Sequence, residues 1–157
     1  MRIIADFHIH EIKQYDKIIS KEKLKEFTRA IGLAANGVGI GSFVYLRRIF
    51  ESLILSTYTE HKDSIEIPET KFISLRMEEK IQTLKNYLPK FLIDNKSLYS
   101  ILSLGIHELN EQDCLIYFET VKVGIEIILD EKLEEAKRKE KEQERRIETG
   151  KREAVTV

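Results

Sequence analysis

The helical spacing of apolar residues constrains the fold of this chain more than any other feature. Between residues 43 and 58, apolar side chains recur every three or four positions, which places them on one face of an amphipathic helix. Similar patterns run through residues 24–34, 73–88 and 115–129. The alternation typical of a strand is confined to residues 2–10. The sequence therefore predicts an all-α protein.

Polar residues and proline at the ends of these patterns indicate where helices begin and end. Ser20 is a suitable N-cap, since its hydroxyl can accept a hydrogen bond from a backbone N–H of the first turn, and Asn110 can do the same for the last helix. Pro89 disfavours helical geometry at the preceding residue and can begin a short helix around residues 91–92. Residues 97–105 fit another short helix, with serine first and glycine last.

The chain of 157 residues corresponds to one domain with two flanking segments. Residues 1–19 are expected to form a short extended N-terminal arm, and residues 20–135 the helical domain. Beyond Asp130 the apolar pattern stops, and the charges that follow are balanced in sign. We therefore expect residues 136–157 to form an exposed helical extension, supported by pairs of opposite charge, that frays toward Gly150 and is partly disordered. The alternative is a tail that binds nucleic acid or another partner.

Charge and composition limit the possible partners. The 26 basic and 27 acidic residues give a formal net charge of -1, so the molecule as a whole has no field that attracts nucleic acid or an anionic membrane. No apolar run approaches the roughly 20 residues of a membrane-spanning helix, and we expect no secretory signal. The single cysteine, Cys114, excludes an internal disulfide and is typical of a reducing compartment. We expect a soluble, cytoplasmic protein without a membrane partner.

The N-terminal stretch IIADFHIH, residues 3–10, has the Asp-x-His-x-His spacing of a metal site. It resembles the start of metal-dependent phosphoesterases of the PHP type, in which His8 and His10 would be metal ligands. Those proteins draw further ligands from later strands of a barrel, whereas this chain continues with helical patterns. Because a metal site needs three or four ligands in fixed geometry, we expect no metal here and no small-molecule cofactor.

A run of small residues lies in the stretch IGLAANGVGIGS. In one continuous helix, Ala30, Ala34, Gly37 and Gly41 would share a single face. The glycines lack the lysine and the strand–turn–helix context of phosphate-binding loops. Glycine lowers helix stability by roughly 1 kcal/mol, which the close packing of a second backbone can offset. We interpret the four residues as a stripe for tight helix packing, across a dimer axis, with an anion site as the alternative.

Two longer segments carry a resemblance to known proteins. They are GIGSFVYLRRIFESLI, residues 39–54, and SLYSILSLGIHELNEQDCLIYFETVKVGIEIILDE, residues 97–131. Both resemble an uncharacterised bacterial family of small helical proteins, and the order of helix, Gly-x-His turn and final helix is similar to the HEPN superfamily. The resemblance covers most of residues 12–135 and implies a bundle of four to five helices, usually dimeric. Active members of that superfamily are metal-independent RNases with an Arg-x4-6-His motif at the start of the final helix.

The histidine of that motif matches His107, but the arginine has no counterpart, since residues 100–102 are Ser, Ile and Leu. Arg47 or Arg48 could approach His107 through the fold and clamp a phosphate bidentately, with Glu108 as a further acid–base group. One hypothesis is therefore a divergent RNase that uses the ribose 2'-hydroxyl as nucleophile. In the alternative, His107 and Glu108 only cap or hydrogen-bond a helix junction.

The missing arginine favours a second hypothesis for the whole protein. In this hypothesis, the protein is a non-catalytic HEPN-like helical interaction module, a homodimer that binds a protein or RNA partner. The resemblance also implies a defence or toxin–antitoxin context.

Overall fold

The computed structural model describes residues 12–155, apart from the side chains of Ile106 and residues 152–155. With η for a 3-10 helix, the elements are η1 (Lys13–Tyr15), α2 (Lys21–Ala35), α3 (Gly39–His61), η2 (Lys62–Ser64), α4 (Glu69–Ser74), α5 (Met77–Thr83), α6 (Lys90–Asp94), η3 (Lys96–Ser103), η4 (Ile106–Glu108) and α7 (Glu111–Val155). Every element of this part of the chain is helical, which confirms the all-α prediction. The extended segment predicted over residues 2–10, with His8 and His10, lies outside the described residues.

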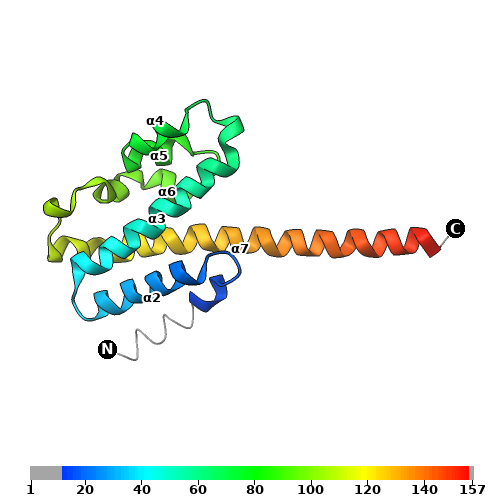
Figure 1. Cartoon of the computed structure of the whole chain (residues 1–157), viewed down its shortest axis with the longest axis horizontal. Coiled ribbons are helices and arrows are strands. Elements are labelled where there is room, and N and C mark those ends of the chain that lie inside the picture. Colours follow the sequence, from blue (N-terminus) through cyan, green and yellow to red (C-terminus); the bar gives the residue numbers. More distant parts are fainter. Residues whose placement is uncertain (1–11, 156–157) are drawn as a thin grey trace.

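Helix α3 forms the centre of the molecule. It packs against both α2 and α7, and α5 packs on η3, which in turn contacts α7. Figure 1 shows α2 on one side of α7 and the short helices α4, α5 and α6 on the opposite side. The HEPN-like bundle of four to five helices remains a prediction.

The core lies between these layers and is rich in aromatic rings. Phe50 of α3 stacks on Tyr99 of η3 with 5.1 Å between ring centroids, and Tyr58 stacks on Phe72 at 4.4 Å. Tyr99, Phe50 and Phe27 are fully buried. Since full burial of a large apolar side chain stabilises a fold by about 1.5–3 kcal/mol, these contacts fix the short segments onto α3.

The helix predicted from Ser20 is present, but it does not continue into the next one. Ser20 Oγ accepts a hydrogen bond from Lys23 N at 3.2 Å, as predicted. Helix α2 then ends at Ala35, and Gly37 has a φ of 79°, a left-handed conformation that breaks the helix. The single stripe of Ala30, Ala34, Gly37 and Gly41 is therefore wrong, because its members lie on two helices and the turn between them.

The segment between α3 and α7 is broken into shorter helices than the pattern predicts. The single helix predicted over residues 73–88 is instead α4 and α5, separated by extended backbone at Leu75 and Arg76. The break has a packing reason. In one continuous helix Phe72 and Met77 would point about 140° apart, whereas here both are buried in the same core.

The next two short elements follow the prediction more closely. Pro89 lies directly before α6, and Leu92 of that helix is fully buried. The helix predicted over residues 97–105 is η3, and Asn95 rather than Ser97 precedes it. Gly105 follows η3 and begins the turn into η4.

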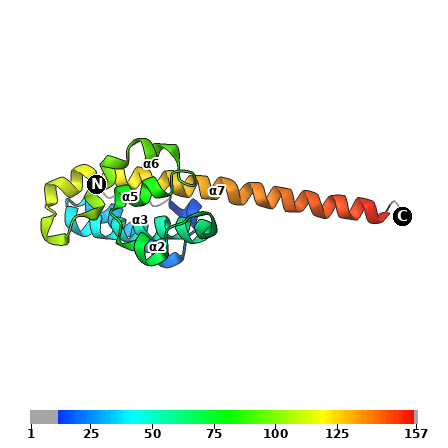
Figure 2. The same ribbon diagram turned by 90° about the horizontal axis from the view of Figure 1, so that it is seen from above.

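Helix α7 starts where the sequence predicts and continues well beyond Asp130, where the apolar pattern stops. Asn110 Oδ1 accepts a hydrogen bond from Asp113 N at 2.8 Å, which confirms the N-cap. The helix has 45 residues, so it is roughly 67 Å long, and its second half projects from the body (Figures 1 and 2). It reaches Val155, five residues beyond the Gly150 toward which the extension is expected to fray. Charge pairs such as Glu135 with Lys139, 3.3 Å apart, support this exposed half.

Residues 12–19 are not an extended arm. Ile12 and Tyr15 are buried, and Tyr15 lies in η1. Its hydroxyl donates a hydrogen bond to Asp130 Oδ1 at 2.5 Å. This bond fixes the segment to α7 at the point where the apolar pattern stops.

Candidate functional site

The predicted catalytic histidine lies at the molecular surface. His107 is in η4, and 86% of its side chain is exposed to solvent. Its Nε2 lies 3.7 Å from Glu108 Oε1, and the Glu108 side chain is 50% exposed. The ring lies against Gly105, where an added Cβ would come within 2.8 Å of His107 Cε1. The two residues thus form an exposed pair on a short turn.

The two candidate arginines point in different directions. Arg47 Nη2 donates a hydrogen bond to the backbone carbonyl of Leu104, in the segment that leads to His107. Arg48 instead pairs with Glu26 of α2, with 3.3 Å between Nη2 and Oε1. Arg47 is therefore the arginine that contacts the turn before η4, and it does so through the backbone.

Arg47 is held firmly in this position. Its Cζ lies 6.0 Å from the centroid of the Phe43 ring, within reach of a cation–π interaction. Its Nε is buried without a hydrogen-bond partner among the described residues. The guanidinium is fixed between α3 and the Leu104 carbonyl, with other N–H donors still uncommitted.

Two surface hollows lie beside this segment and share Arg76, Ser103 and Leu104. The larger, about 490 Å³, lies between the start of α5, η3 and the start of α7. Besides Arg76, its charged lining residues are acidic: Glu78, Glu108 and Asp113.

The smaller hollow has the opposite charge. It measures about 310 Å³ and lies between α3, the α4–α5 junction and the end of η3. Its charged lining residues are Arg47, Arg76, Lys80 and Glu51. Arg76 and Lys80 were not singled out from the sequence, because charged residues on a short amphipathic helix are normally read as a solvated face.

Cys114 is not a reactive group. The thiol is free and fully buried at the start of α7. Burial raises its pKa first of all, with Glu111 and Asp113 adding to the effect, while Arg47 acts in the opposite direction. A raised pKa keeps the thiol protonated and weakly nucleophilic.

The described part of the chain has neither a metal-binding cluster nor a membrane-spanning helix. Between residues 12 and 155, no three His, Cys, Asp or Glu side chains are grouped so as to hold a metal ion. Likewise, none of the helices described is both long and apolar enough to cross a membrane.

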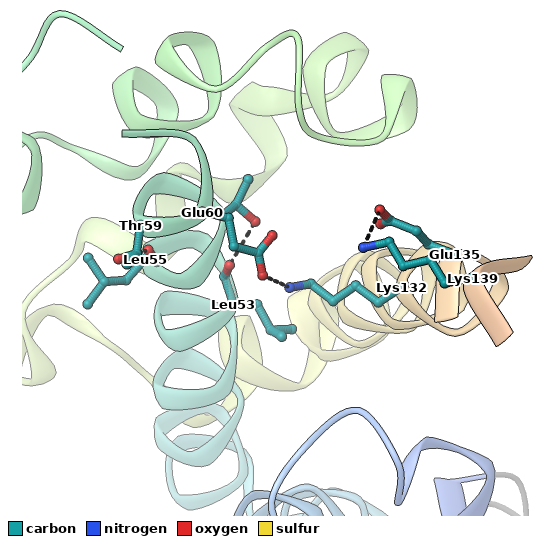
Figure 3. A network of polar contacts seen from close by, with 8 residues as sticks. Leu53, Leu55, Thr59, Glu60, Lys132, Glu135 and Lys139 are labelled. Carbon is teal, nitrogen blue, oxygen red and sulfur yellow. Dashed lines mark hydrogen bonds and ion pairs between the residues drawn. The ribbon is translucent and has the colours of Figure 1, made fainter. Parts of the chain in front are cut away.

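An ion pair links α7 to α3 where the exposed half of α7 begins. Lys132 Nζ lies 3.7 Å from Glu60 Oε1 near the end of α3, and Figure 3 shows this pair where the helix leaves the body. One turn further, Glu135 and Lys139 pair with each other instead (Figure 3). From there to Lys151 every residue except the half-buried Ala136 is exposed.

No protein-family model, curated protein or solved structure matches this chain.

Proposed function

We propose that the protein is a non-catalytic helical interaction module that binds a protein partner through the exposed half of α7. The observation that supports this most is the continuous exposure of residues 137–151 on a helix that extends well beyond the body. An exposed helix of this length adds no burial to the fold. It does offer a long surface to another molecule.

The charges of this surface favour protein over RNA. Acidic and basic side chains are interspersed along residues 131–151 in nearly equal number. Binding to RNA depends on cations that neutralise phosphates, and interleaved carboxylates oppose that. A protein with a complementary pattern of both signs suits the surface better. An RNA partner, and the defence or toxin–antitoxin setting that the HEPN resemblance implies, remain proposals on that resemblance alone.

A homodimer is also part of the proposal, on a surface different from the predicted stripe. Ile116 and Val123, which are seven residues apart on α7, are 64% and 37% exposed. Together with the half-buried Ile127 they lie on the side of the helix opposite the buried Val121 and Ile125. A second copy of the chain can cover this apolar face.

Charge reversal on α7 tests the partner surface in the full chain. Lys137, Lys141 and Arg145 form an exposed row at spacing four, and the matched control is the exposed row of Lys21, Lys25 and Arg29 on α2. In one variant the three residues of the α7 row are replaced by glutamate, and in the other those of the α2 row. Circular dichroism first verifies that both variants are as helical as the wild type. All three proteins are then used as bait to capture partners from cell lysate.

We expect a defined set of bound proteins that is retained by the α2 variant and lost by the α7 variant. Identical protein sets from all three baits would contradict a partner surface on α7. If the wild-type bait retains RNA from the lysate and no defined set of proteins, the partner of α7 is RNA and not protein.

A metal-independent RNase is the second candidate function. Its support is that Arg47 contacts the backbone at Leu104, three residues before His107. The exposure of His107 weighs against it, because general acid–base groups act best when water is excluded. To decide between the interaction module and the RNase, total RNA is incubated in EDTA with the wild type and, separately, with His107→Ala, and RNA cleavage is measured. The module predicts intact RNA with both proteins, and cleavage by the wild type alone would establish the RNase.

A further inference from the structure

The smaller hollow concentrates positive charge from three elements. Arg47 comes from α3, Arg76 from the junction before α5, and Lys80 from α5 itself. Glu51 is the single carboxylate in the lining. A site with three cations and one anion has a charge surplus that a doubly charged ligand would neutralise.

Among the described residues, none of the three cations forms an ion pair with a carboxylate. Elsewhere on the described surface, Arg48, Lys132 and Lys139 pair with carboxylates at 3.3–3.7 Å. The neighbours in the hollow are instead a backbone carbonyl for Arg47 and the ring of Phe72, 5.8 Å from Lys80 Nζ.

The hollow also has apolar side chains in its lining. Ile73 and Leu104, both in the lining, are 54% and 38% exposed. A hydrogen bond that Met77 N donates to Ser103 Oγ at 2.8 Å joins two further lining residues and fixes the start of α5 to the end of η3. Cations beside exposed apolar side chains suit a ligand with an anionic group and an organic body.

We propose that this hollow binds the phosphate group of a small phosphorylated ligand. Arginine binds phosphate oxygens bidentately, and Arg47 and Arg76 bring two guanidinium groups to one site. Phosphate is preferred to carboxylate because its second charge matches the cation surplus. The organic part of the ligand contacts Ile73 and Leu104.

The neighbouring hollow restricts the ligand to a single phosphate. Beyond the shared Arg76 it carries Glu78, Glu108 and Asp113. These carboxylates repel a second phosphate group and so disfavour a polynucleotide. The site is thus independent of both functions proposed above, since it needs neither the exposed half of α7 nor RNA cleavage.

Calorimetric titration of the full chain with inorganic phosphate, at constant ionic strength, tests the site. The variant is Arg76→Ala with Lys80→Ala, whose side chains are exposed and half-buried, so that folding is little affected. The matched control is Arg29→Ala with Lys25→Ala, an exposed pair on α2. Acetate serves as the singly charged competitor.

We expect phosphate to bind the wild type and the α2 control alike, and to bind the Arg76/Lys80 variant at least about tenfold more weakly, as the loss of charge-assisted hydrogen bonds implies. Acetate should bind more weakly than phosphate. Three results would each overturn the proposal: absence of phosphate binding by the wild type, equal weakening in both variants, or acetate bound as tightly as phosphate.

Discussion

At the scale of single residues, Gly124 of α7 lies directly against the Tyr99 ring. A Cβ at position 124 would lie 2.5 Å from the Tyr99 hydroxyl and 2.8 Å from Cε1. Tyr99 is fully buried and stacked on Phe50, so it has no room to withdraw. We predict that Gly124→Ala destabilises the protein by about 1–3 kcal/mol, measured by urea unfolding.

A second glycine provides the control for that replacement. Gly32 lies inside α2, and a Cβ there would meet nothing within 4 Å. Gly32→Ala should therefore stabilise the protein by roughly 0.5–1 kcal/mol through helix propensity alone. Unchanged stability in Gly124→Ala would show that η3 does not pack on α7 as closely as described.

Tyr99 also makes stability dependent on pH in the alkaline range. Burial raises the pKa of its hydroxyl from 10.0 to about 12. Because the pKa is higher in the folded chain, the contribution of the neutral group to stability is complete below pH 10 and is lost as pH rises toward 12. We predict that the wild type loses stability relative to Tyr99→Phe over this interval. A difference between the two free energies of unfolding that stays constant from pH 9 to 12 would contradict this.

At the scale of elements, the start of α3 is stabilised by the start of α7. Val38 at the N-cap of α3 offers no side-chain hydrogen bond. Glu111 Oε2 caps the helix instead, because it accepts hydrogen bonds from Gly39 N at 2.5 Å and from Ile40 N at 3.3 Å. We predict that Glu111→Ala costs about 0.5–2 kcal/mol in the free energy of unfolding, as the loss of a helix cap does. Glu119→Ala, an exposed replacement on the same helix, should be nearly neutral.

This contact also explains which helix ends the sequence could predict. The caps at Ser20 and Asn110 depend on backbone N–H groups three residues away, so the local pattern reveals them. The cap of α3 comes from a residue 72 positions later, and no local pattern contains it. The glycine run contains both kinds of feature, since Gly37 turns the chain locally, whereas Gly39 lies against the distant backbone of Glu111.

The exposed half of α7 should be the least protected part of that helix. Residues 137–151 are stabilised by charge pairs worth only about 0.2–0.5 kcal/mol each, whereas the buried half packs on α3. We predict that amide hydrogens of residues 137–151 exchange much faster than those of residues 118–129. Gly150→Ala should slow exchange near its own position only. Equal protection along the whole helix would indicate that another molecule covers the exposed half.

At the scale of the whole molecule, the fold class followed from periodicity, but the candidate site did not. Helical spacing is repeated along the chain and survives local errors, as the division of residues 73–88 into α4 and α5 illustrates. The positive hollow depends on Arg47, Arg76 and Lys80 meeting through tertiary packing. The sequence singled out Arg47 for a different partner, and the structure joins it to Leu104 instead.

Dimerisation is the property of the whole molecule that depends most directly on a small surface. A stable interface covers about 800 Å² on each partner, and exposed apolar side chains at its centre contribute most of the affinity. Ile116 and Val123 are such side chains on the outer face of α7. Ile147 lies far along the same helix, and its exposure of 55% falls between theirs. We predict that the wild type sediments as a dimer and that Ile116→Glu with Val123→Glu sediments as a monomer.

Ile147→Glu serves as the control in the same sedimentation measurement, because it adds the same charge to the same helix away from the proposed interface. It should remain dimeric. If Ile147→Glu dissociates the dimer while the double variant does not, the two copies meet along the exposed half of α7, and the partner surface proposed there is a self-association surface. A wild type that is monomeric at every concentration tested would exclude the homodimer and leave the outer face of α7 for another protein.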